Sequence, residues 1–117
     1  MLRAAGDRRG ESQALVLLAW LARNLGRMEE AERVAREAER IARELGDRES
    51  IARAVGNRGL VHFSRGEYEE ALVCHREQEA IVRELGDRRN TGFAVGHRGG
   101  VHWQRGEYEE SLACFRE

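Results

Sequence analysis

The apolar residues of this chain recur with the spacing of amphipathic helices. Between residues 27 and 45 they lie three or four positions apart, with arginine and glutamate between them; the apolar set is Met28, Ala31, Ala35, Ala38, Ala42 and Leu45. This spacing places apolar side chains on one face of an α-helix and charged side chains on the other. The pattern predicts a helix over 27–45 whose apolar face packs against a neighbouring element.

The pattern returns with a period of forty residues, which indicates an internal repeat. Gly46-Asp47-Arg48 recurs at 86–88 and also stands at 6–8, and the hexapeptide at 65–70 recurs at 105–110. Compared position by position, 46–77 and 86–117 are identical at 20 of 32 positions. The chain is therefore expected to form a single domain, 1–117, with three units at 6–45, 46–85 and 86–117.

Glycines divide each unit into two expected helices. Gly46 and Gly86 follow apolar stripes, where a left-handed helix end favours glycine, and the aspartate after each can cap the next helix. Gly26, Gly66 and Gly106 end the first helix of each unit. The predicted helices span roughly 8–25, 27–45, 47–65, 67–85, 87–105 and 107–117. Since no strand pattern interrupts them, the fold class is all-α.

Composition and charge agree with a helical chain and exclude several functions. The chain has no proline, 35% of its residues are charged, and its net charge is −1 without a run of like charges. A nucleic-acid arm is therefore not expected. The apolar stretch from Ala14 to Ala22 is too short to span a membrane and lacks the flanks of a signal peptide. Two cysteines are too few for a disulfide scaffold, so we expect a cytoplasmic protein.

Each unit also carries residues that match a known consensus. The matching positions are Val55, Gly59, His62, Tyr68, Ala71 and His75 in the second unit, and Val95, Gly99, His102, Tyr108, Ser111 and Phe115 in the third. These runs resemble the tetratricopeptide repeat, W-x2-L-G-x2-Y followed by A-x3-F and P. The unit is longer than the usual length of about 34 residues, the proline is absent, and arginine and histidine replace the family's leucine and tyrosine. It is similar to the longer repeats of kinesin light chain, polarity scaffolds and bacterial regulators.

The resemblance implies a right-handed solenoid of three helix-turn-helix repeats, the last one short, whose first helices line a concave groove. Members of the family bind an extended peptide or a partner helix there. Carried over by register, the lining also takes in Gln13, Val16, Leu17, Gly56, Ser64, Gly96 and Gly100. Its main candidates for a peptide-binding site are Trp20, Arg23, Asn24, Arg53, Asn57, Leu60, Phe63, Phe93, His97, Trp103 and Gln104. Exposed rings beside arginine and asparagine supply anchors and hydrogen-bond donors, so we expect Phe63 and Trp103 in the groove.

Polar residues stand where the family is apolar. Arg58 and His62 lie four residues apart on one helix face, as do Arg98 and His102. A buried arginine needs a carboxylate or carbonyl partner; the available glutamates are Glu69, Glu70, Glu109 and Glu110. We expect a structural hydrogen-bond network that fixes the register of the helices. A ligand site or a pH switch through histidine is the alternative.

Five residues are potential zinc ligands: His62, Cys74, His75, His102 and Cys114. Their spacing is that of the repeat and contains no closely spaced pair typical of a zinc site. Equivalent residues lie one unit apart in a solenoid, too far to share an ion. We therefore expect no metal, no cofactor and no catalytic cysteine.

The predicted function is recognition of a protein or peptide with apolar anchors and a carboxylate, as part of a scaffold or signalling regulator. The alternative is a structural element that forms a homodimer through its terminal repeat, because Val101, Tyr108, Leu112 and Phe115 are expected to be exposed. An enzyme ranks last, since no nucleophile, base and orienting group appear together.

Overall fold

Six α-helices and no strand make up the part of the chain that the structure describes, residues 5–117 of a computed structural model. They are α1 (Ala5–Asn24), α2 (Met28–Leu45), α3 (Arg48–Ser64), α4 (Tyr68–Glu84), α5 (Arg88–Gln104) and α6 (Tyr108–Arg116). Five begin within a residue of their predicted start. The first begins earlier, so the motif at 6–8 forms no turn, and Asp7 lies in the first turn of α1, where the helix dipole favours a carboxylate.

The predicted turns are confirmed at five glycines. Gly26, Gly46, Gly66, Gly86 and Gly106 have φ between 65° and 80°, a conformation that residues with a Cβ rarely adopt.

Aspartate caps the helices that follow two of these turns. The backbone N–H of Ser50 donates to Asp47 over 3.4 Å, and that of Asn90 donates to Asp87 over 3.0 Å. The first helices of the second and third units therefore begin at a side-chain cap. Helices α2, α4 and α6 instead begin with two glutamates in the first turn and no side-chain cap.

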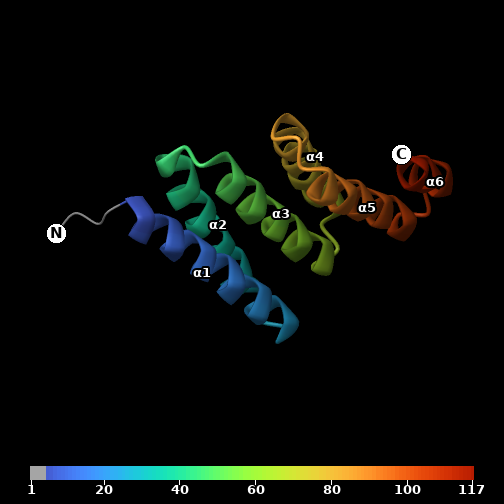
Figure 1. Cartoon of the computed structure of the whole chain (residues 1–117). Helices are drawn as coiled ribbons and strands as arrows, with labels where there is room; N and C mark the ends of the chain where they lie inside the picture. The colour runs from blue at the N-terminus through green and yellow to red at the C-terminus, as the bar shows by residue number, and fades with distance from the viewer. Residues whose placement is uncertain (1–4) are drawn as a thin grey trace.

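The helices pack in chain order and form an elongated solenoid measuring 52 × 33 × 17 Å. In Figure 1, α1 and α3 run side by side, α2 lies behind them, and α5 runs in the same direction as α1 and α3. Ile51, Ala52 and Val55 of α3 form one buried cluster with Ile81 and Val82 of α4. The sequence period of forty residues thus corresponds to one helix pair of the solenoid.

Missing side chains at two glycines let the two helices of a unit approach closely. A Cβ added at Gly59 would lie 2.8 Å from the His75 ring and 3.0 Å from Cβ of Cys74. The equivalent Gly99 faces the Phe115 ring at 2.8 Å. The buried His75 ring cannot withdraw without opening the core, so glycine is required at Gly59; the Phe115 ring is 63% exposed and can move away from position 99.

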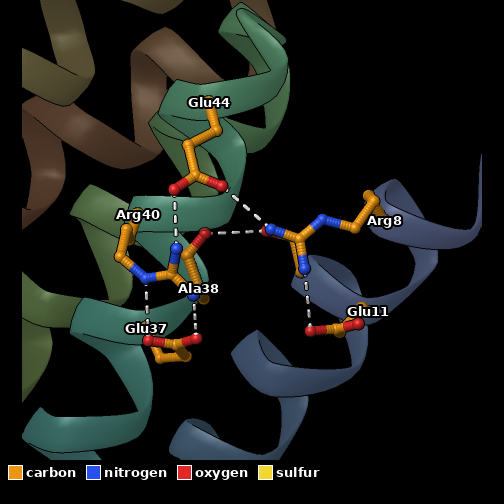
Figure 2. Close-up of polar contacts among 7 residues, drawn as sticks. Arg8, Glu11, Glu37, Ala38, Arg40 and Glu44 are labelled. Carbon is orange, nitrogen blue, oxygen red and sulfur yellow. Dashed lines mark hydrogen bonds and ion pairs between the residues drawn. The ribbon is translucent and has the colours of Figure 1, made fainter. Parts of the chain in front are cut away.

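Polar contacts fix the first helix pair at its open end. In Figure 2, Arg8 of α1 reaches Glu44 of α2, 2.9 Å away, while also contacting Glu11 on its own helix. Arg40 joins the same network through Glu44 and Glu37. Ser12 donates a buried hydrogen bond to the carbonyl of Ala38 over 3.0 Å.

The two interior arginines each contact a glutamate, as predicted, but the partner is different. Arg58 donates to Glu39 over 2.8 Å, and Arg98 donates to Glu79 over 2.7 Å. These glutamates belong to the helix before the arginine, not the helix after it. Each ion pair therefore joins one unit to the next.

The interior histidines pair with glutamates across the turns. His62 Nδ1 lies 3.0 Å from Glu67, and His102 Nδ1 lies 2.8 Å from Glu107. This hydrogen bond lowers the pKa of Glu107. Both contacts tie the end of a first helix to the start of the second.

We predict that Gly59→Ala destabilises the fold by about 1–3 kcal/mol, because the new methyl group overlaps the buried His75 ring. Gly100→Ala is the matched control: it lies in α5 and has no atom within 4 Å of an added Cβ. There alanine should stabilise the helix by about 0.5–1 kcal/mol. Urea unfolding followed by circular dichroism measures both changes. Equal effects of the two variants would show that α3 and α4 are not in close contact.

We further predict that Arg58→Leu changes the free energy of unfolding by less than about 1 kcal/mol, because an apolar side chain often replaces a buried ion pair without loss. Glu39→Ala should destabilise more, since it leaves Arg58, whose side chain is 19% exposed, without its carboxylate. Thermal and urea unfolding of both variants tests the order. Small, equal losses would mean that solvent already screens the pair.

Candidate ligand-binding groove

A pocket of about 420 Å³ lies between α1 and α3 and is completed by residues of α4 and α5. Its lining comprises Val16, Leu17, Trp20, Arg53, Gly56, Asn57, Leu60, Gln78 and His97. The sequence predicted all of these except Gln78. Gln78 belongs to α4 and lies against Gly56, where an added Cβ would come within 2.5 Å of its amide nitrogen. Because Gly56 has no side chain, Gln78 of α4 can pack against α3 at this position and reach the pocket.

Asn57 provides an unpaired acceptor in the pocket. Its side chain is buried and donates through Nδ2 to the backbone carbonyl of Val16 over 2.7 Å. This bond links α3 to α1 and fixes the orientation of the amide. Oδ1 is buried and has no hydrogen-bond partner among the described residues. Because an unsatisfied buried acceptor is unfavourable, an N–H group of a ligand would be stabilised there.

Two histidine rings lie together at the pocket, and one of them, His97, is part of its lining. His75 of α4 and His97 of α5 have ring centroids 4.7 Å apart. His75 Nδ1 lies 3.1 Å from Gln78 Oε1; since that oxygen accepts, Nδ1 carries the proton. Burial lowers the pKa of His75 to about 4. Burial, and then the charge of Arg23, lower the pKa of His97. The His75 ring is therefore neutral at pH 7.

The cationic groups of the groove differ in their pairing. Arg53 is paired with Glu49 on the same helix at 2.8 Å. Arg23 contacts the Ser64 hydroxyl at 3.3 Å, while its Nε is buried without a partner. No carboxylate of the described residues forms an ion pair with Arg23. It is the cation on this face best placed to receive an acidic group.

The other predicted groove residues lie outside the pocket. Asn24 donates to the carbonyl of Trp20 in its own helix, and Gln104 is exposed. Phe93 is exposed beneath the guanidinium of Arg89.

The two rings expected in the groove are engaged at the turns. Phe63 is half-buried against the Ala71–Leu72–Val101 cluster and contacts Tyr68 at 5.8 Å. Trp103 is 60% exposed, but its ring meets Tyr108 edge-on at 5.1 Å. Each ring therefore packs against the start of the second helix instead of lining the pocket.

Among the residues that it describes, the structure contains neither a cluster of potential metal ligands nor a helix that could span a membrane. Within the described part of the chain, no three His, Cys, Asp or Glu side chains lie close enough to hold an ion. No helix within residues 5–117 has the length and apolar character needed to cross a bilayer. Cys74 and Cys114 are buried and free, and burial raises the pKa of both thiols.

Comparison with known proteins identifies the repeat. Two profiles described as tetratricopeptide repeat match residues 12–45 and 50–117. The chain belongs to the tetratricopeptide repeat family. The crystal structure of the TPR domain of Arabidopsis FLU superposes with a TM-score of 0.85, covering 93% of this chain and 92% of that one. At 18% identity, this likeness shows the fold alone. A search of curated protein sequences found no match.

A tetratricopeptide domain is a protein–protein interaction module and is typically not catalytic. The pocket described above lies on the face formed by the first helices of its repeats. The polar atoms at this pocket belong to helices that also pack the tetratricopeptide units against one another.

We predict that the free energy of unfolding of this tetratricopeptide domain decreases as the pH is lowered, and that His75 causes part of this decrease. The folded pKa is about 4, whereas the ordinary value is 6.5, so the unfolded chain takes up the proton first. The contribution is complete above pH 6.5 and is lost as pH falls toward 4. At about pH 5 the loss amounts to about 2 kcal/mol.

His75→Phe is the matched control, because Phe115 occupies the equivalent position opposite Gly99. Urea unfolding at about pH 7.5 and about pH 5 should show a smaller difference for the variant than for the wild type. The same difference in both proteins would show that His75 remains accessible to water.

Proposed function

We propose that this tetratricopeptide domain binds a peptide or helix of a partner protein in the pocket between α1 and α3. The main observation is the combination of apolar walls with unpaired polar atoms. Trp20 and Leu60 offer apolar surface, and Trp20 is 48% exposed. Asn57 Oδ1 in the lining and Arg23 Nε outside it are buried without hydrogen-bond partners among the described residues.

The chemistry of the pocket favours one kind of ligand. An apolar side chain would bury its surface against Trp20 and Leu60, contributing about 25 cal/mol per Å² removed from water. A backbone or side-chain N–H would donate to Asn57. A carboxylate further along the ligand would pair with Arg23. This supports a segment with a large apolar anchor followed by an acidic group.

The wider role belongs to the same proposal. A domain of this kind serves as a scaffold or signalling regulator, and its free buried cysteines agree with a reducing compartment such as the cytoplasm. Neither nucleic acid nor a lipid surface suits the groove, because Arg23 and Arg53 do not extend into a basic patch.

Self-association is a second candidate, favoured by one observation. Tyr108, Leu112 and Phe115 of α6 are 60%, 42% and 63% exposed. The prediction that Val101 belongs to this exposed surface is wrong. Val101 is fully buried, because Ala71 and Leu72 of α4 pack against it. Sedimentation at increasing concentration separates this dimer from a monomeric binder, and Leu112→Asp should dissociate it.

The two tryptophans allow a controlled test of the groove. Peptides selected from a phage-displayed library against the chain should bind at least about tenfold more weakly to Trp20→Ala, because an aromatic anchor is lost. Trp103→Ala removes a ring that is similarly exposed but lies outside the pocket. Its affinity should stay within about twofold.

Isothermal calorimetry gives both dissociation constants, and circular dichroism checks that the variants remain folded. Selected peptides that tolerate Trp20→Ala but lose binding to Trp103→Ala would refute the proposed site.

A further inference from the structure

His97 adds a titratable group to the pocket between α1 and α3. Leu17, Asn57 and His97 lie forty residues apart, one in each unit, and all three belong to the lining of this pocket. The side chain at this position is apolar in the first unit, an amide in the second and an imidazole in the third. The third unit therefore supplies a group whose charge can change near neutral pH.

One nitrogen of the His97 ring makes no hydrogen bond. Nδ1 is buried and has no hydrogen-bond partner among the described residues. Two other histidines differ in this respect, because His62 pairs with Glu67 and His102 pairs with Glu107. These two lie at the turns and outside the pocket lining. His97 is consequently a pocket histidine without a carboxylate partner of its own.

Arg23 is the unpaired charge that acts on His97. It belongs to α1 and lies outside the pocket lining, but its charge reaches the ring. From α3, Arg53 lines the same pocket, and its charge is paired with Glu49. From α4, the His75 ring lies 4.7 Å away between centroids and is neutral at pH 7. Helix α6 contributes no residue to this lining.

These surroundings favour the neutral ring when the groove is empty. Burial, and then the positive charge of Arg23, lower the pKa of His97. A carboxylate that pairs with Arg23 cancels this repulsion and brings a negative charge toward the ring. Since an opposite charge nearby favours the charged form of a group, the pKa of His97 is higher in such a complex than in the free protein.

We propose that His97 takes up a proton from the solvent when the carboxylate of a peptide pairs with Arg23, so that the groove recognises an acidic segment with two cations. This inference rests on the groove proposed above and names the residue that makes its affinity depend on pH. The proton adds to the ring nitrogen that is unprotonated in the free protein. Both ring nitrogens then carry a hydrogen, and Nδ1 can donate to the peptide.

The direction of the pH dependence follows from linkage. Proton uptake and peptide binding strengthen each other by the same factor. The additional affinity is complete below the pKa of His97 in the free protein and is lost as pH rises through its pKa in the complex. His75, with a pKa of about 4, stays neutral at about pH 6 and does not contribute. A glutamate of the peptide, with an ordinary pKa of about 4.3, stays ionised there.

The probe is a peptide selected at about pH 6 from a phage-displayed library in which one glutamate is fixed and the neighbouring positions vary. A selected peptide is kept if Trp20→Ala weakens its binding, which places it in the groove. Isothermal calorimetry should give a dissociation constant about fivefold lower at about pH 6 than at about pH 7.5. The same titration at about pH 6.5 in two buffers of different ionisation enthalpy should show net proton uptake.

Two matched controls remove the effect from opposite sides of the contact. His97→Asn introduces the residue that the repeat already holds at the equivalent position, Asn57, and circular dichroism checks that the variant is folded. Its affinity for the peptide should change less than about twofold between the two pH values, because asparagine does not titrate. A peptide with glutamine in place of the fixed glutamate should behave in the same way toward the wild type.

Nuclear magnetic resonance measures the titration of the ring itself. The His97 ring signals, assigned by their loss in His97→Asn, should titrate at a higher pH in the complex than in the free protein.

A peptide that needs Trp20 but binds equally well at both pH values would overturn the inference and leave the groove in place. The same conclusion would follow if the pH dependence persisted in His97→Asn. If no selected peptide depends on Trp20, the groove itself is wrong and the inference falls with it.

Discussion

Contact between α3 and α4 at Gly59 positions the rest of the molecule. Because this residue has no Cβ, His75 and Cys74 of α4 pack directly on the backbone of α3. His75 then meets His97 of α5, so the same ring also positions the third unit. One helical turn along, Gln78 passes the open backbone of α3 and reaches the pocket. The close approach of two helices thus determines both the stacking of the repeats and the floor beneath the groove.

The fold follows from the sequence because its determinants are local. Glycines at the turns and aspartate caps act within a few residues, and the period of forty repeats them. Register also placed Trp20, Asn57 and His97 on one face, and the structure brings them to the same pocket. Register cannot choose between neighbours, however. Phe63 packs against Tyr68 across the turn, and Arg58 pairs with a glutamate nineteen residues before it. Both contacts depend on how the helices pack in three dimensions.

The groove between α1 and α3 offers two kinds of chemistry. Its apolar walls surround an unpaired amide oxygen at Asn57. Arg23 lies outside this lining, contacts Ser64 of α3 and forms no ion pair with a carboxylate of the described residues. A ligand with an apolar anchor followed by an acidic group would use both.

The central claim is that ligands bind the concave groove, and nuclear magnetic resonance tests it directly. The chain has two tryptophans, so a ¹⁵N-labelled sample gives two indole N–H signals. During titration with a library-selected peptide, the Trp20 indole and the Asn57 side-chain amide should shift and saturate together, while the Trp103 indole stays in place. Shifts confined to Trp103 and to the second helices of the units, α2, α4 and α6, with the Trp20 and Asn57 signals unchanged, would contradict the account.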